Sequence, residues 1–292
     1  MIDYKTQLKI KSEFLQAARA FLLGKKFIEI QTPKISFMPT DQDDHLFKVE
    51  YFGKETYLIQ SPQFYKQAYV INGVDSIFEI APVFRAEPRV TERHLSEFTS
   101  LDIESSRFQK LETILDFESD LLKSITKALS LKYDIKPIET FEIVSYNDVK
   151  KALKLDQSTP LNNKYEKEIS KHFQADGIFI IDYPSKERVF YYETIDEISL
   201  SYDLIVQGLE ITSGGIRTAS KERIIKSMQA ENIDPARYIP YLELFNDKVP
   251  THGGFAIGVE RIISRYLQIP DIAAVSPYNK KPDTTGDKLV WT

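Results

Sequence analysis

The sequence predicts an α+β fold in which helices flank an antiparallel β-sheet. Apolar residues recur at helical spacing near the N-terminus and again between residues 107 and 131. After residue 176 the chain becomes a succession of β-rich runs, such as "LSYDLIVQGLEITSGG". Because no internal repeat is present, one mixed domain over residues 1–292 is the simplest interpretation.

Composition limits the class of protein. The chain has 292 residues, of which 42% are hydrophobic, enough for a large buried core. A net charge of −5 gives no overall basic field, which counts weakly against a nucleic-acid partner. No apolar run approaches the roughly 20 residues that cross a bilayer, and the start, "MIDYKTQLKIKSEF", lacks the apolar stretch of a secretory signal. We therefore expect a cytoplasmic protein without membrane contact.

Cysteine and histidine usage restricts the metal chemistry. The chain has no cysteine, which excludes a disulfide, a thiolate nucleophile and cysteine-ligated zinc. Its four histidines are scattered and show no paired metal-ligand spacing. Any bound metal is therefore expected to be Mg²⁺ held by oxygen ligands.

The first half of the chain begins with a helix. Its apolar stripe stops at Gly24, a residue type that commonly follows a helix end. The next run, "KKFIEIQTP", is β-rich and is closed by Pro33, and "SFMPTDQDDHLFKV" then predicts an acidic loop that leads into another strand. A long amphipathic helix is expected over residues 107–131.

The second half begins with a polar segment. Residues 135–171 are interrupted by "QSTPLNNKYEKE", so we expect a small α/β insertion at about 135–184 that is not part of the main sheet. Strands are then expected at "GIFIIDYP", "VFYYET" and "LSYDLIVQGLEITSGG". A helical stretch follows, and "PTHGGFAIGVERIISRYL" predicts a glycine-rich strand that runs into a helix.

One segment, "FRAEPRVTERHLSEFTSLDIE" at residues 84–104, carries unusual charge for a pair of strands. The period of two places Arg85 with Glu87, and it places Phe98 on the same face as Asp102 and Glu104. Such a hairpin offers guanidinium groups for phosphate oxygens, acids for Mg²⁺ and a ring to stack on a base, which are the needs of a nucleoside triphosphate site. The hairpin alone fits a solvated face with salt bridges equally well.

Two later stretches favour the ligand site. In "LEITSGGIR", Glu210 lies at a strand end, and a turn at residues 213–215 would let the backbone approach a ligand before Arg217. In "GGFAIGVERI", a second glycine-rich strand leads to Arg261 at the start of a helix.

Together these stretches resemble the three motifs of class II aminoacyl-tRNA synthetases, most closely those of the aspartate and asparagine branch. "GKKFIEIQTPKI" resembles motif 1, the charged hairpin resembles motif 2, and "GGFAIGVERI" resembles motif 3. The resemblance runs from about residue 9 to residue 277. It implies the class II antiparallel sheet flanked by helices, and a homodimer formed through motif 1.

The resemblance also implies an ATP site. Arg85 would bind the α-phosphate and Arg261 would cover the adenine and the γ-phosphate, which makes these two the expected catalytic residues. Glu87 would contact the adenine edge, and Phe98 would stack on the adenine ring.

Four further residues complete the implied nucleotide site. Arg93 and His94, from the hairpin loop, are expected among the ATP-binding residues. Glu210 and Ser213 would hold Mg²⁺. ATP and Mg²⁺ are therefore the expected co-substrate and metal.

The segment "QSPQFYKQ", residues 60–67, resembles the aspartyl rather than the asparaginyl enzymes. Lys66 and Arg217 suit a side-chain carboxylate, because two cations would leave an amide with the wrong partner. Gln63 would also contact the amino acid, and His252 would help to cover it. Asp41 stands where the family has a glutamate for the substrate's ammonium. As alternatives, Lys66 is a solvated helix residue and His252 a hydrogen-bonding loop residue.

The chain departs from the family in three places. No anticodon-binding barrel fits before the first helix, the substrate loop "TDQDDHLF" lacks the family's flexible glycines, and "KERVFYYETIDEIS" lacks a proline before its aromatic pair. We therefore expect an ATP-dependent ligase that forms aspartyl-adenylate and transfers the aspartyl group to ammonia, giving asparagine, or to another small amine. Transfer to tRNA or a modified tRNA base is the alternative, and a non-catalytic amino-acid sensor is the alternative from another class.

Overall fold

An eight-stranded sheet forms the centre of the computed structural model, which describes residues 3–40, 45–156, 158–276 and 278–287. Its inner strand pairs are antiparallel, and only the pairs at the two edges, β1–β5 and β7–β8, are parallel. The expected α+β class is confirmed. In sheet order the strands are β1 (Ile28–Glu29), β5 (Ser76–Phe84), β6 (Glu97–Ser105), β13 (His252–Gly258), β12 (Leu209–Arg217), β11 (Ser201–Val206), β8 (Gly177–Ile181) and β7 (Phe141–Ser145).

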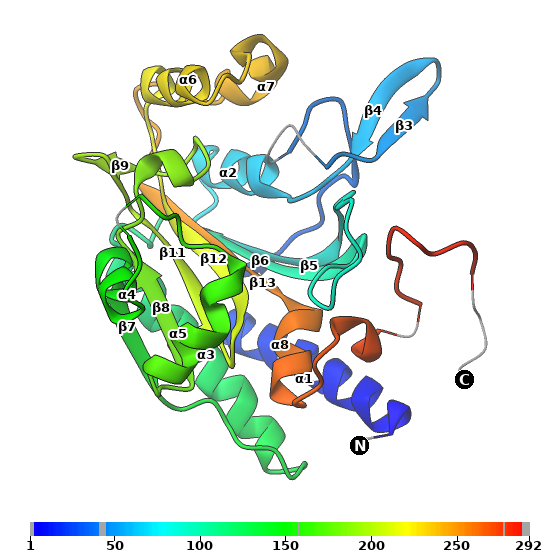
Figure 1. Ribbon diagram of the computed structural model, residues 1–292. Coiled ribbons are helices and arrows are strands. Elements are labelled where there is room, and N and C mark those ends of the chain that lie inside the picture. The colour runs from blue at the N-terminus through cyan, green and yellow to red at the C-terminus, as the bar shows by residue number, and fades with distance from the viewer. Residues whose placement is uncertain (1–2, 41–44, 157, 277, 288–292) are drawn as a thin grey trace.

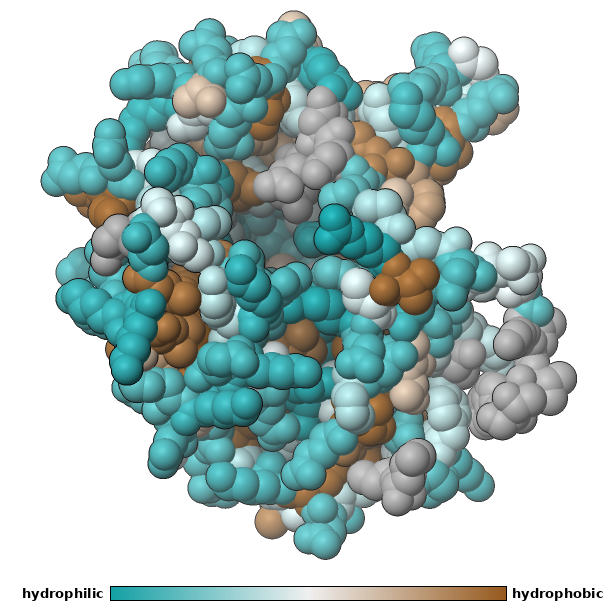
Figure 2. Space-filling view, viewed as in Figure 1, coloured by the Kyte–Doolittle hydropathy of each residue, from teal (hydrophilic) through white to brown (hydrophobic). Residues whose placement is uncertain are grey.

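Two small sheets stand apart from the main one. β2 (Ile35–Ser36), β4 (Lys54–Leu58) and β3 (Lys48–Tyr51) form a ribbon that projects at the upper right of Figure 1. β9 (Thr194–Ile195) and β10 (Ile198–Ser199) form a short hairpin. In the view of Figure 2, the surface is mainly hydrophilic, with separate hydrophobic patches.

Helices α1, α3 and α8 cover one face of the main sheet and close the largest hydrophobic core (Figure 1). Leu101 and Ile103 of β6 are fully buried in this core, whereas Asp102 and Glu104 belong to a polar network with groups from α2 and β12. The predicted alternation of the hairpin strand is therefore confirmed. The helices are α1 (Tyr4–Gly24), α2 (Gln63–Ile71), α3 (Leu111–Ser130), α4 (Tyr146–Ala152), α5 (Glu166–His172), α6 (Lys221–Ala230), α7 (Ile239–Leu242) and α8 (Val259–Tyr266).

A second, aromatic core fixes helix α2 beneath α6 and α7. The rings of Phe64 and Tyr241 stack with centroids 4.2 Å apart, and the Tyr241 hydroxyl donates to Gln67 Oε1 at 2.6 Å. Ring stacking and a buried hydrogen bond both oppose sliding of one helix past the other. Because Gln63 and Lys66 lie on α2, this core sets the position of two predicted site residues.

Four local expectations differ from the structure. β7, expected to lie apart, joins the main sheet because it pairs with the buried strand β8. β5 ends at Phe84, so residues 85–87 lie beyond the strand. "VFYYET" is mostly irregular, because three of its aromatic rings enter the second core. Residues 213–215 lie within β12 rather than in a turn, paired with β11 and β13 on either side.

Among the described helices, none combines the length and apolar character that a membrane crossing needs.

One carboxyl group is buried in the main core. Glu118 of α3 is fully inaccessible, and its Oε2 accepts a hydrogen bond from the Tyr202 hydroxyl at 2.5 Å. Burial raises the pKa of Glu118 to about 7. Between the ordinary glutamate pKa and this value, the unfolded chain has released a proton that the folded chain retains. The free energy of unfolding therefore falls as pH rises through this window.

Replacing Glu118 with glutamine is expected to remove this pH dependence. The glutamine side chain does not titrate, so the stability of Glu118→Gln relative to wild type should increase from pH 5 to pH 8, by about 2–3 kcal/mol for a pKa shift of this size. Urea unfolding of both proteins at the two pH values measures this difference, and every other titrating group is common to both. A difference that does not change with pH would contradict the assignment.

Candidate active site

One cavity brings together all the residues expected to bind ATP and Mg²⁺. It lies where the β5–β6 hairpin meets β12, β13 and the start of α8. Ser61, which precedes α2, and Ser100 of β6 line the side of the cavity nearest the predicted amino-acid residues. The predicted residues that line the cavity are Arg85, Glu87, Arg93, His94, Phe98, Glu210, Ser213 and Arg261.

The loop end of the β5–β6 hairpin combines a guanidinium with an aromatic ring. Arg85 directly follows β5, and its guanidinium carbon lies 5.8 Å from the centroid of the Phe98 ring on β6. The Arg85 amide donates to Ser96 O at 2.9 Å, which continues the strand pairing past the end of β5. Glu87 lies with its Oε2 3.8 Å from His45 Nδ1. A ring beside a cation suits a base next to its phosphates.

Arg261 is held by backbone carbonyls from two other elements. Its Nε donates to Arg93 O at 3.3 Å, and its Nη1 donates to Glu210 O at 3.0 Å. The neighbouring Glu260 accepts from the Thr99 amide at 2.9 Å and pairs with Lys11 at 2.6 Å. The start of α8 is therefore fixed against both the hairpin and α1, so Arg261 has a defined direction into the cavity.

Three arginines and three glutamates line this cavity, and their charges affect the titrating groups. Burial lowers the pKa of His94 to about 4, with Arg261 and Arg93 adding to the effect, so the imidazole is neutral at neutral pH. Its Nδ1 lies 3.0 Å from Thr91 Oγ1. Burial also raises the pKa of Glu210, with a further contribution from Asp203, while Arg261 opposes the shift.

The candidate metal ligands are only two side chains, a carboxylate and a hydroxyl. Glu210 has its Oε1 3.4 Å from Arg261 Nη1, and Ser213 Oγ accepts from Arg188 Nη2 at 2.8 Å. Arg188 is in turn paired with Asp203 through two contacts of 2.8 Å. Within the described ranges, no group of three or more histidines and acids could hold a metal by itself. A cation here would need further oxygen ligands from phosphate or water.

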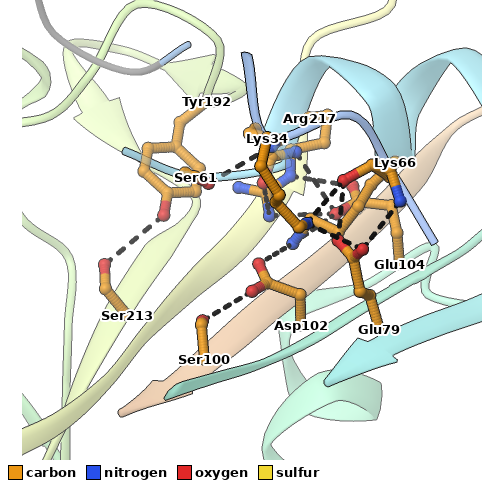
Figure 3. A network of polar contacts seen from close by, with 12 residues as sticks. Lys34, Ser61, Lys66, Glu79, Ser100, Asp102, Glu104, Tyr192, Ser213 and Arg217 are labelled. Carbon is orange, nitrogen blue, oxygen red and sulfur yellow. Dashed lines mark hydrogen bonds and ion pairs between the residues drawn. The ribbon is translucent and has the colours of Figure 1, made fainter. Parts of the chain in front are cut away.

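The predicted amino-acid residues form a buried ionic cluster beside the cavity (Figure 3). Arg217 Nε lies 2.9 Å from Glu104 Oε1, and Arg217 Nη2 donates to Gln63 Oε1 at 3.1 Å. Lys66 Nζ lies 2.9 Å from Asp102 Oδ1 and 3.6 Å from Glu104 Oε2. The alternative of a solvated Lys66 is therefore wrong, because its side chain is fully buried.

Besides Lys66 Nζ, which has its ion pair with Asp102, two nitrogen atoms of this cluster lack hydrogen-bond partners among the described residues. They are Nη1 of Arg217 and Nε2 of His252, both on side chains with almost no exposure. His252 Nδ1 lies 2.8 Å from Pro250 O, and burial lowers the pKa of this imidazole. A buried donor without a partner is costly unless a ligand supplies one. Arg217 therefore marks a point where an acceptor group is missing. Asp41 lies outside the described residues.

Glycine in β13 makes room for this cluster. Gly254 pairs with Glu104 across the β6–β13 ladder. A Cβ on Gly254 would lie 2.2 Å from Ile103 O and 2.3 Å from Glu104 Oε2, closer than real Cβ atoms approach. Gly254 of β13 thus leaves room for the buried carboxylate of Glu104, whereas the sequence suggested that the backbone of this strand approaches a ligand.

Several residues of the site were not assigned from sequence. Asp102 and Glu104 were predicted only as part of an acidic face suited to Mg²⁺, and they neutralise Lys66 and Arg217 instead. Asp203 is a single charge in the apolar strand "SYDLIV", a signal that could have identified it. Arg188 and Glu166 carry no comparable signal, because their partners are distant in sequence.

Comparison with known proteins agrees with this geometry. Residues 2–282 match the family model described as tRNA synthetases class II (D, K and N). The chain is 33% identical to the aspartate–tRNA(Asp) ligase of Pyrococcus horikoshii over 289 residues, which cover 91% of this chain and 66% of that protein. It is 34% identical to the aspartate–tRNA(Asp/Asn) ligase of Thermus thermophilus, covering 92% and 68% of the two chains.

Solved structures show the same fold. The asparaginyl-tRNA synthetase from Pyrococcus horikoshii complexed with asparaginyl-adenylate superposes with a TM-score of 0.87 at 26% identity, over 96% of this chain and 69% of that one. The aspartyl-tRNA synthetase from Entamoeba histolytica gives 0.81 at 29% identity, over 94% and 58%. The chain thus spans about two thirds of the length of these relatives. It belongs to the class II tRNA synthetase family for aspartate, lysine and asparagine.

Proposed function

We propose that this protein activates aspartate with ATP, forming aspartyl-adenylate and pyrophosphate. We call the cavity lined by the predicted ATP residues the nucleotide cavity, and the ionic cluster of Lys66 and Arg217 the amino-acid cluster. The observation that carries the proposal is that these two sites are joined. Ser100 Oγ lines the nucleotide cavity and donates to Asp102 Oδ2 at 2.5 Å, and Asp102 pairs with Lys66 of the amino-acid cluster. An amino acid near Arg217 would therefore lie beside a nucleotide near Arg85.

In the proposed reaction, an α-carboxylate oxygen of aspartate attacks the α-phosphorus of ATP. The new C–O–P linkage forms as the bond from the α-phosphorus to the bridging oxygen breaks, and pyrophosphate leaves with the electron pair. Arg85 would pair with the α-phosphate oxygens, and Arg261 with the departing phosphates. Their contribution is to position the reactants and to stabilise charge that builds on the phosphates, so no protein nucleophile is needed.

The remaining ATP residues complete this proposal. Phe98 would stack on the adenine and Glu87 would accept from its amino edge, while Arg93 and neutral His94 would face the outer phosphates. Glu210 and Ser213 fit Mg²⁺ because both provide hard oxygen atoms, and burial leaves the Glu210 carboxylate in need of a counter-charge. When bound, Mg²⁺ would neutralise phosphate charge.

Aspartate is proposed over asparagine because the unpartnered Arg217 Nη1 is a donor. Nε and Nη2 already donate to Glu104 and Gln63, so a substrate side chain would meet Nη1. There a carboxylate accepts a charge-assisted hydrogen bond, whereas the neutral amide of asparagine accepts only a weaker one. The Lys66 charge is already balanced by Asp102, so selection rests more on Arg217 than the sequence suggested. The aspartate specificity of the two curated relatives supports the same choice.

A pyrophosphate-exchange assay across the 20 amino acids tests this proposal directly. We expect exchange with aspartate that exceeds exchange with asparagine by at least an order of magnitude, since the neutral amide cannot form the charge-assisted contact with Arg217. The absence of exchange with every amino acid, in a folded protein that binds ATP, would contradict the proposal and favour the sensor alternative. Preferred use of asparagine would contradict the assignment of Arg217.

The acceptor of the aspartyl group is a second part of the proposal. The names of the relatives support transfer to tRNA, whereas Asp41, Asp43 and Asp44 of the sequence favour ammonium or another amine. Labelled aspartate, ATP and Mg²⁺ should be incubated with total tRNA, with ammonium, or with a series of primary amines. We place tRNA first because relatives covering nearly the whole chain support it. Labelled asparagine or another small amide formed faster than aspartyl-tRNA would reverse this order.

A homodimer through motif 1 stays a prediction. β1 lies at the edge of the main sheet, and Ile28 within it is 56% exposed. Sedimentation equilibrium measures the oligomeric state of the wild-type protein and of Ile28→Asp, which places a charge on this edge.

A further inference from the structure

We propose that Glu166 is a positioning residue for the nucleotide site. Through Glu166, the segment at residues 135–184 controls the arrangement of the site's arginines. This inference rests on the proposed function. It assigns a role in that site to a carboxylate of helix α5, which belongs to a different part of the fold from the three sequence motifs.

Glu166 uses both carboxylate oxygens to join two elements of the site. Its Oε1 lies 2.7 Å from Nη2 of Arg93, in the hairpin loop. Its Oε2 accepts from the backbone amide of Glu210, in β12, at 3.0 Å. The side chain of Glu166 is 6% exposed and that of Arg93 is 17% exposed. A charge-assisted contact so little exposed to water resists thermal rearrangement more than a surface ion pair does.

Arg93 and Glu210, the two partners of Glu166, also hold Arg261. Arg261 Nε donates to the Arg93 carbonyl and Arg261 Nη1 donates to the Glu210 carbonyl. The four residues therefore form a closed ring of contacts, from Glu166 to Arg93, to Arg261, to Glu210 and back to Glu166. Removing Glu166 would open the ring, so that Arg261 alone would join the Arg93 loop to β12 and the supports of its guanidinium would be less firmly fixed.

Glu166 itself lies behind the nucleotide site. It lines a separate polar cavity with Asp203 and Arg188, and it is not among the residues that line the nucleotide cavity. Arg93 lines the nucleotide cavity, and its buried Nε has no hydrogen-bond partner within the described chain. Glu166 thus acts on the nucleotide through Arg93 and Arg261. This arrangement distinguishes a positioning role from direct contact with ATP.

The test uses three single variants of the full chain. In Glu166→Ala, we expect kcat/KM for ATP in aspartate-dependent exchange to fall by about 10–100-fold, because the arginines lose their fixed geometry. The KM for aspartate should stay within about twofold. Glu166→Gln retains one acceptor oxygen and should lie between Glu166→Ala and wild type. Glu168→Ala is the matched control, because Glu168 is an exposed acid in the same first turn of α5, and it should leave both parameters unchanged.

A double-mutant cycle identifies the path of the effect. In an Arg93→Ala background, Glu166→Ala should have at most about a third of its effect on the logarithm of kcat/KM for ATP, because the main partner is gone. Equal effects in both backgrounds would overturn action through Arg93. Tighter ATP binding in Glu166→Ala would also overturn the proposal, since it would mean that Glu166 competes with phosphate for Arg93.

Binding of a non-hydrolysable ATP analogue, measured by calorimetry, separates this inference from the proposed function. If the wild-type protein binds the analogue but shows no exchange with any amino acid, the proposed function fails, and the Glu166 cycle can still be measured by binding alone. Unchanged binding and unchanged exchange in a folded Glu166→Ala protein would overturn the positioning role alone. Thermal unfolding of each variant verifies that the comparison is between folded proteins.

Discussion

Replacing Arg85 with alanine is expected to reduce aspartate-dependent pyrophosphate exchange by about 10²–10³-fold, the usual effect of losing one donor that stabilises developing charge. Arg85 lies at the loop end of the β5–β6 hairpin beside the Phe98 ring, where an α-phosphate would lie next to a stacked adenine. The loss should appear mainly in kcat. A donor to the reacting phosphate gains strength as charge builds in the transition state, whereas the bound ATP retains its other contacts.

The matched control for this variant is Arg89→Ala. Arg89 belongs to the same hairpin loop but is exposed and is not among the residues lining the cavity. The two variants have the same change in net charge, so a difference between them reports position rather than overall electrostatics. Comparable exchange rates in Arg85→Ala and Arg89→Ala, with both proteins folded, would exclude Arg85 from the reaction.

The second large effect is expected from Arg217 in the amino-acid cluster. Removing this guanidinium alone would leave Glu104 buried with less counter-charge and would destabilise the fold. We therefore expect Arg217→Met to be informative in a Glu104→Gln background, where one positive and one negative charge are removed together and the Lys66–Asp102 pair is retained. Relative to Glu104→Gln alone, kcat/KM for aspartate should fall by about 10² or more, as for loss of a charge-assisted contact.

The KM for ATP provides the internal control for this pair of variants. Arg217 is not among the residues lining the nucleotide cavity, so ATP binding should stay close to that of Glu104→Gln. A parallel loss for ATP and aspartate would mean that the substitution disturbs the whole site. Retained use of aspartate would mean that another group, and not Arg217, binds the side-chain carboxylate.

Local patterns in the sequence predicted the parts of the site that depend on local structure. The period of two placed Asp102 and Glu104 on one face of β6, and the glycine-rich run before Arg261 is a strand that enters a helix. Motif spacing also predicted residues that line one cavity together, and their binding of ATP stays a prediction. These predictions succeed because strand alternation and helix starts are set by neighbours in the chain.

Contacts between distant residues were harder to predict. Lys66 looked like a free cation for the substrate, but Asp102 neutralises it across the space between α2 and β6. β7 looked too polar for the main sheet, and it joins at an edge, where only one of its sides pairs with another strand. The role of Glu166 depends on a hydrogen-bonded ring of four residues from four elements. No spacing rule within one segment contains that information.

The pairing of β6 with β13 has a consequence for how the chain folds during synthesis. Ser105 of β6 pairs with Gly253 of β13, so the middle of the sheet joins segments about 150 residues apart. At about 5–20 residues per second, the ribosome needs roughly 7–30 s to make the intervening chain. During this time the β5–β6 hairpin presents an open edge with buried-type residues such as Leu101 and Ile103. Such an edge can pair with another nascent chain. We therefore expect the newly made protein to depend on chaperones more than its final stability would suggest, and refolding from denaturant to be slow and sensitive to protein concentration.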